Sequence, residues 1–181
     1  MLEDFNKIIA AFKYWNFNRP LNPIESYNDR FLIQKLAFLC QSLGLNMNYT
    51  FGIYLAGPYS KALADDYFAF HENLNGLITP YEPTKTDIEI FGKITEIILN
   101  KEVKGGRKME YLEAVATIQK LLHRGDIESE DELYVQTKEI KPHLSDYIIT
   151  IALNAVKQLN FKSEYLTDEL KEEFDLWDRI D

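Results

Sequence analysis

The chain has 181 residues, the length of one ordinary domain or of two very small ones. Hydrophobic residues make up 46% of the chain and aromatic residues 13%, which excludes intrinsic disorder over most of its length. The formal net charge of −9 disfavours broad nucleic-acid binding, because that needs basic residues to neutralise phosphates. The single cysteine, Cys40, excludes an internal disulfide and a cysteine-based zinc site.

The N-terminal residues do not form a basic start followed by an apolar run, as a signal peptide would. No stretch reaches the roughly 18 uninterrupted apolar residues of a membrane span. We therefore expect a soluble, cytoplasmic protein with no membrane partner.

The first half of the chain predicts two helices. Residues 2–17 place Phe5, Ile8 and Phe12 on one helical face, and the prolines within 18–23 end that helix. A second helix begins at Asn28 or Asp29 and ends at Gly44. It is apolar around most of its circumference. Its narrow polar stripe consists of Arg30, Gln34, Lys35 and Gln41.

The pattern then changes to that of a strand. Apolar and other residues alternate over 49–55, and Gly57-Pro58 predicts a turn. A helix follows from Tyr59 or Ser60 to Gly76. The short apolar run 77–81 can pair with 50–55, which would make a small wing beside the helix.

The second half is helical throughout. Helices are expected over 84–103 and 109–122, from Ser129 to about residue 140, and after Ser145. The adjacent glycines within 104–107 mark the best domain boundary. We predict a mainly α fold with a small two-stranded, winged-helix-like β element over 1–104, and a helical C-terminal part over 105–181 packed on it.

The last residues are strongly acidic, with eight acids and two bases over 163–181. Leu166, Leu170, Phe174 and Trp177 nevertheless repeat at helical spacing. This segment is therefore an amphipathic helix, which either docks on the body of the protein or binds a partner or a second copy.

Two sequence blocks resemble a known group of proteins. The first runs from Arg30 through Gln34-Lys35-Leu36, then along 51–56 to Gly57-Pro58-Tyr59-Ser60; the second covers 111–118 and Lys141-Pro142. Together they resemble an uncharacterised prokaryotic family with a "Leu-Gln-Lys-Leu" helix and a "Gly-Pro-Tyr-Ser" turn. Ile33 stands where that pattern usually has leucine.

The blocks resemble, more distantly, the Panacea-domain proteins, which are phage-associated or antitoxin-like. The resemblance spans roughly residues 30–160. It implies a helical, partly winged-helix-like domain and a role as an antitoxin or regulatory adaptor. It implies no catalytic activity.

The segment from Gly57 to Lys61 is the sharpest local feature. Glycine permits an unusual backbone, Pro58 fixes φ, and Ser60 can cap a helix. The segment is then a strand-to-helix turn, or an anion site at a helix N-terminus that Lys61 assists.

A second candidate is the polar stripe of Arg30, Gln34 and Lys35. It is either a surface edge paired with acids or an interaction stripe. If Glu113 faces Arg30 or Lys35, the two sequence blocks meet at one polar seam.

We expect no enzymatic activity, cofactor or metal. Glu110 and Glu113 share a helix face, which suits acid–base chemistry or a salt-bridged stripe, but no nucleophile accompanies them. The three histidines are scattered, and Cys40 lies among apolar residues as a buried, inert thiol would.

The first functional hypothesis is an interaction protein that binds a partner protein, such as a toxin or a phage-related factor. A cluster of tyrosines around the predicted wing either suits this role or is the half-buried packing of a small sheet on helices; its members are Tyr49, Tyr54, Tyr59, Tyr67 and Tyr81. The alternative is a winged-helix-type DNA-binding regulator, with nucleic acid as partner. Asp65 and Asp66 make the helix after Ser60 a poor reader of a DNA groove.

Overall fold

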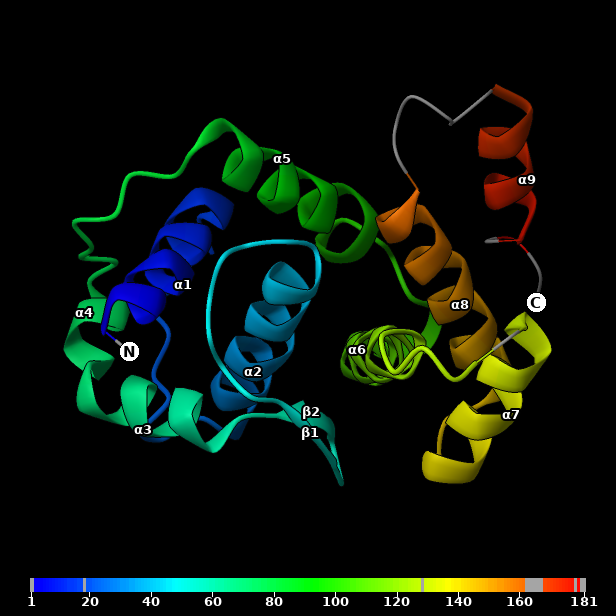
Figure 1. Ribbon diagram of the computed structural model, residues 1–181, viewed down its shortest axis with the longest axis horizontal. Coiled ribbons are helices and arrows are strands. Elements are labelled where there is room, and N and C mark those ends of the chain that lie inside the picture. Colours follow the sequence, from blue (N-terminus) through cyan, green and yellow to red (C-terminus); the bar gives the residue numbers. More distant parts are fainter. Residues whose placement is uncertain (1, 18, 128, 162–167, 178, 180–181) are drawn as a thin grey trace. The chain divides into compact units, whose positions relative to one another are not determined.

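The computed structural model describes residues 2–17, 19–127, 129–161, 168–177 and 179, and these are mainly α-helical (Figure 1). The predicted fold class is confirmed: helices dominate, with one small two-stranded antiparallel sheet. The chain divides into two compact units, residues 1–95 and 96–181. This division lies nine residues before the predicted boundary, inside a segment that we had expected to be one helix.

Unit 1 is built around two helices, α1 (Leu2–Trp15) and α2 (Tyr27–Ser42). The predicted inner face of α1 is confirmed, since Phe5, Ile8 and Phe12 are buried. The predicted start of α2 is wrong: Ser26, two residues earlier than expected, is the N-cap. Its hydroxyl accepts a hydrogen bond from the amide of Asp29, at 3.2 Å.

Asp29 is not the N-cap; its side chain binds residues of the segment that precedes α2. Its buried carboxylate forms an ion pair with Arg19, whose side chain is 54% exposed, and accepts a hydrogen bond from the amide of Asn22, at 2.8 Å. The prolines of this segment end α1, as predicted, and Asp29 fixes the path of the chain after them.

The sheet contains the predicted strand of 49–55, but that strand has a different partner from the one predicted. β1 (Gly52–Tyr54) pairs with β2 (Gly57–Tyr59) in a tight hairpin whose turn is Leu55-Ala56. The predicted partner, 77–81, forms no strand. The reason is local: a two-residue turn brings β2 back onto β1 directly, and Gly57 supplies a left-handed backbone (φ 85°) where the returning strand starts.

Three helices complete unit 1. Ser60 caps α3 (Lys61–Ala69) as predicted, but the helix breaks at Phe70 and a short α4 (His71–Asn75) follows. Thr84 and Asp87 form a capping box at α5 (Lys85–Ile94). Helix α2 packs against α3, α5 and β2, so the hairpin and the start of α3 lie on one side of it.

Unit 2 begins with one π-helical turn, η1 (Thr95–Leu99), and a 3-10 turn, η2 (Lys104–Gly106). Its body is a bundle of α6 (Lys108–Leu122), α7 (Glu130–Ile140) and α8 (Asp146–Asn160). The predicted caps Ser129 and Ser145 are confirmed at α7 and α8.

The last helix, α9 (Asp168–Trp177), packs on α8 within unit 2 (Figure 1). Phe174 is buried, and its carbonyl accepts a hydrogen bond of 3.1 Å from Asn154 Nδ2. Leu166 and the side chain of Leu170, which belong to the predicted apolar face, lie outside the described residues. The described part of the segment therefore follows the first expectation, a docked helix.

None of the helices in the described part of the chain is both long enough and apolar enough to cross a membrane.

Candidate functional site

The polar stripe of α2 binds the backbone of the hairpin and of the residue after it. Gln34 Nε2 donates to the carbonyl of Ser60 at 2.9 Å, and the amide of Ser60 donates to Gln34 Oε1 at 2.8 Å. Lys35 Nζ donates to the carbonyl of Pro58 at 2.7 Å. Gln34 and Lys35 are both only 2% exposed, so this part of the stripe is an internal support of the hairpin.

Two turns further along α2, Gln41 makes the same kind of contact with Tyr49. Its Nε2 donates to the carbonyl of Tyr49 at 2.8 Å, and the amide of Tyr49 donates to its Oε1 at 3.1 Å. Helix α2 thus holds both ends of the 49–60 segment with side-chain amides. A primary amide can do this because it carries a donor and an acceptor side by side, as a backbone does.

Ser60 and Lys61 are both engaged in local contacts at the start of α3. Ser60 Oγ accepts from the amide of Leu63 at 3.4 Å, while its own amide is bound by Gln34. Lys61 forms an exposed ion pair of 3.3 Å with Asp65. These contacts support the strand-to-helix turn, and none of them points to an anion site at this helix.

The hairpin presents an apolar tip. Leu55 is 94% exposed and Tyr54 is 59% exposed. The rings of Tyr54 and Tyr59 pack edge to face at 5.3 Å, which fixes Tyr54 against the second strand. Gly57 and Pro58 are buried in β2. In the register of the hairpin Gly57 pairs with Tyr54 and Pro58 pairs with Ile53.

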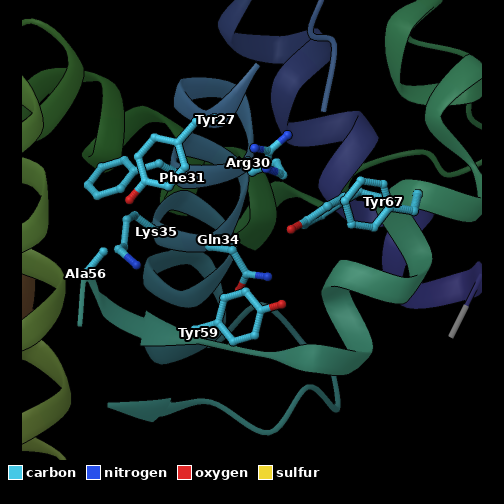
Figure 2. Close-up of a pocket in the computed structure, with 9 residues that line it drawn as sticks. Tyr27, Arg30, Phe31, Gln34, Lys35, Ala56, Tyr59 and Tyr67 are labelled. Atoms are coloured by element: carbon cyan, nitrogen blue, oxygen red, sulfur yellow. The ribbon is translucent and has the colours of Figure 1, made fainter. Parts of the chain in front are cut away.

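A pocket of about 280 Å³ opens beside the hairpin, between α2, Ala56, β2 and α3 (Figure 2). Its polar lining consists of Arg30, Gln34 and Lys35, three residues of the predicted stripe. Its aromatic lining consists of Tyr27, Phe31, Tyr59, Tyr67 and Phe68. The pocket therefore combines two cations with aromatic walls, and no carboxylate lines it.

The polar groups of this pocket face inward. Figure 2 shows the polar ends of Gln34, Tyr59 and Tyr67 turned toward one another. Burial raises the pKa of the Tyr67 hydroxyl, and Gln34 and Arg30 oppose that rise only in part. The hydroxyl therefore stays protonated at neutral pH and can donate a hydrogen bond.

Sequence reasoning found four of the nine lining residues: Arg30, Gln34, Lys35 and Tyr59. It placed Tyr67 in the tyrosine cluster around the predicted wing, and it did not single out Tyr27, Phe31, Ala56 or Phe68 as site residues. The spacing of residues in the sequence could have identified the part of the pocket that α2 lines. Tyr27, Arg30, Phe31 and Gln34 are spaced three, one and three residues apart, which places all four on one face of a helix.

Glu113 lies in unit 2, where residues of that unit bind it. Lys141 Nζ lies 3.0 Å from Oε1, and His143 Nε2 lies 3.3 Å from Oε2. The predicted contact of Glu113 with Arg30 or Lys35 would join the two units, and it stays a prediction. Glu110 pairs separately with Arg107 at 2.7 Å, so each glutamate has its own cation.

Metal ligands do not gather in the part of the chain that the structure describes, since no group of three potential ligands lies together there. Cys40 is buried, as predicted, and burial raises the pKa of its thiol, which leaves it unreactive at neutral pH.

No protein-family model, curated protein or solved structure matches this chain. The resemblance to Panacea-domain proteins therefore stays a prediction.

Proposed function

We propose that this chain is a non-enzymatic interaction protein, antitoxin-like or an adaptor, which binds a partner protein through the tip of the β1–β2 hairpin. The observation that carries the proposal is the exposure of Leu55, at 94%, beside that of Tyr54, at 59%. Burying a leucine side chain contributes about 1.5–3 kcal/mol, which makes an exposed leucine at a hairpin tip a strong contact for a partner.

The hairpin is held in place before any partner binds. Gln34 and Lys35 fix Ser60 and Pro58 to α2 through three buried hydrogen bonds. A tip presented by an anchored hairpin loses little conformational entropy when it binds, and this favours affinity.

Further apolar side chains surround the hairpin. Tyr27 is 59% exposed and Phe68 is 44% exposed, and both line the pocket that Ala56 also lines. Tyrosine and arginine are enriched among the residues that dominate protein–protein binding energy, so this surface has the composition of an interface. The partner proposed is a protein such as a toxin or a phage-related factor.

The alternative, a winged-helix-type DNA-binding regulator, gains little support from the charges. On α3, Lys61 is paired with Asp65, and Asp66 accepts a hydrogen bond from Tyr49. In the basic segment near η2, Arg107 pairs with Glu110, and Lys108 Nζ donates to the carbonyls of Ile98 and Leu99. These cations are already paired within the chain, and the one that faces solvent, Lys61, lies beside Asp65, whose charge opposes phosphate binding.

A tagged pull-down from the native cell extract, with and without nuclease, tests the proposal. Leu55→Asp places a charge on the tip, and because the side chain is exposed the fold should be retained. Ile78→Asp is the matched control, since Ile78 is also an exposed aliphatic residue of unit 1, at 63%.

We expect a stoichiometric protein partner that survives nuclease, is retained by Ile78→Asp and is lost with Leu55→Asp. Equal capture by both variants would reject the hairpin as the binding surface. Recovery of nucleic acid alone, or loss of every partner with nuclease, would put the DNA-binding alternative first.

A further inference from the structure

The pocket beside the hairpin has a charge opposite to that of the chain. Arg30 and Lys35 line it, no acid does, and the chain as a whole carries −9. Asp65, the nearby acid on α3, is paired with Lys61 at the surface. A small site with two cations and low-dielectric walls concentrates anions.

Arg30 has donors to spare for such an anion. Its Nη1 donates to the carbonyls of Pro23, at 2.8 Å, and Ile24, at 3.3 Å. Its Nε and Nη2 donate to no residue that the structure describes. Two neighbouring N–H groups of a guanidinium form the planar fork that binds a carboxylate with two hydrogen bonds.

Tyr67 supplies a further donor at the same pocket. Its side chain is buried, at 2% exposure, and its hydroxyl turns toward Gln34 and Tyr59 (Figure 2). A buried neutral hydroxyl beside a guanidinium is suited to a carboxylate oxygen, because it donates without adding charge.

The remaining walls select a flat apolar body of limited size. Tyr27, Phe31 and Phe68 contribute rings, which favour aromatic partners in tilted or stacked arrangements. A volume of about 280 Å³ corresponds to roughly nine water molecules. This is room for one ring with an acid group and is too small for a nucleotide.

We propose that this pocket is a binding site for a small aromatic carboxylate, with the carboxylate on Arg30 and Tyr67 and the ring among Tyr27, Phe31 and Phe68. Lys35 adds positive charge at the floor while its ammonium holds Pro58. The carboxylate site needs no partner protein, because every group that it uses belongs to unit 1, although Tyr27 and Phe68 are shared with the surface proposed for the partner.

Titration of the full ¹⁵N-labelled chain with benzoate and phenylacetate tests this site. Benzamide, which has the same shape without the charge, and acetate, which has the charge without the ring, are the matched controls. The side-chain amide of Gln34 is the reporter, since it lies in the pocket and is held by Ser60. We expect saturable shifts at Gln34 with at least one aromatic carboxylate, about tenfold tighter than with either control.

Two variants connect the binding to the proposed residues. Tyr67→Phe removes only the hydroxyl and should weaken binding by about fivefold, while Arg30→Gln should weaken it by about tenfold or more. Arg124→Gln, at an exposed arginine of unit 2, should change nothing. Because Arg30 also binds two carbonyls, thermal unfolding of Arg30→Gln is compared with that of the wild type, and Tyr67→Phe carries the test if Arg30→Gln is unfolded.

Three outcomes would overturn the proposal. The first is that neither carboxylate shifts Gln34 up to about 10 mM. The second is that benzamide or acetate binds as tightly as the carboxylates. The third is that folded Tyr67→Phe and Arg30→Gln proteins bind as the wild type does.

Discussion

Gln34 and Ser60 are joined by two hydrogen bonds between a side-chain amide and a backbone, at 2.9 and 2.8 Å. Gln34 is thereby the partner of the residue that ends the hairpin and begins α3. Both residues are buried, so water cannot replace either bond. Gln34 thus contributes to the position of the exposed hairpin tip, together with Lys35, which holds Pro58.

The first prediction concerns this pair. Gln34→Leu leaves the buried amide of Ser60 without a partner, while the carbonyl of Ser60 keeps its hydrogen bond from the amide of Ala64 at 3.1 Å. The substitution should lower the free energy of unfolding by about 1–3 kcal/mol. Urea denaturation measures the loss. Gln158→Leu, at a half-buried glutamine of α8, is the control and should cost less than about 1 kcal/mol. A neutral or stabilising Gln34→Leu would show that the pair does not support the hairpin.

The second prediction is a dependence on acidic pH. Burial alone would raise the pKa of Asp29, but hydrogen bonds from Arg19, the amide of Asn22 and Ser26, together with the charge of Arg19, hold it below its ordinary value. The stabilisation is therefore fully present above the unfolded pKa of about 3.9, and is lost as the pH falls through the lower folded pKa.

Asp29→Asn removes this contribution. At neutral pH the variant should be less stable than the wild type by about 1–3 kcal/mol, and the difference should shrink as the pH falls below the unfolded pKa of Asp29. Urea denaturation of both proteins across this range makes the comparison. Asp87, whose pKa is also lowered, is present in both proteins and cancels in the difference. A difference that stays constant from neutral to acidic pH would contradict the account.

The third prediction concerns the buried pair in unit 2. Lys141 is 2% exposed at its side chain and Glu113 is 11% exposed, with 3.0 Å between Nζ and Oε1. Glu113→Leu alone leaves a buried ammonium and should cost about 3–5 kcal/mol. Adding Lys141→Met should restore much of that loss, because no uncompensated charge then remains.

A double-mutant cycle on the exposed pair of Lys85 and Glu89, 3.9 Å apart, is the control. Its coupling energy should stay below about 1 kcal/mol. If the coupling between Glu113 and Lys141 is equally small, the pair does not contribute to the stability of unit 2.

The fourth prediction concerns the docking of α9 on α8. Phe174 is buried and packs edge to face against Phe161, with ring centres 6.2 Å apart. Phe174→Ala should therefore release α9, which hydrogen exchange at α9 amides would detect as lost protection. Leu176→Ala, at a residue 63% exposed, should leave the protection unchanged. Equal exchange in both variants would show that Phe174 does not hold the helix.

Local signals predicted the helices well, and long-range pairings less well. Ser60, Ser129 and Ser145 were identified as caps because a cap depends on the next three residues alone. The partner of β1 was missed because Gly57-Pro58 is typical of a turn, whereas here both residues lie in the returning strand. For a strand of three residues, the sequence alone does not decide between the two possible partners, 57–59 and 77–81, because the choice depends on tertiary packing.

The candidate site was also predicted only in part, because helical spacing gives the residues of a stripe but not their tertiary contacts. Helical spacing placed Arg30, Gln34 and Lys35 in one stripe, but only the structure shows that Gln34 and Lys35 support the hairpin from inside. Phe31 and Tyr67 were not among the predicted site residues, because apolar periodicity cannot distinguish a core residue from one that lines a pocket. The exposure of Leu55 at the tip follows from the unpredicted turn.

Site-specific photo-crosslinking in the native cell tests the central claim, that the hairpin tip binds a partner protein, most directly. p-Benzoylphenylalanine in place of Tyr54 puts the crosslinker at the tip. The same group in place of Tyr14, a tyrosine of α1 that is 45% exposed, is the matched control. We predict one crosslinked protein partner from position 54 and none from position 14. The same products from both positions, or none from position 54, would contradict the claim.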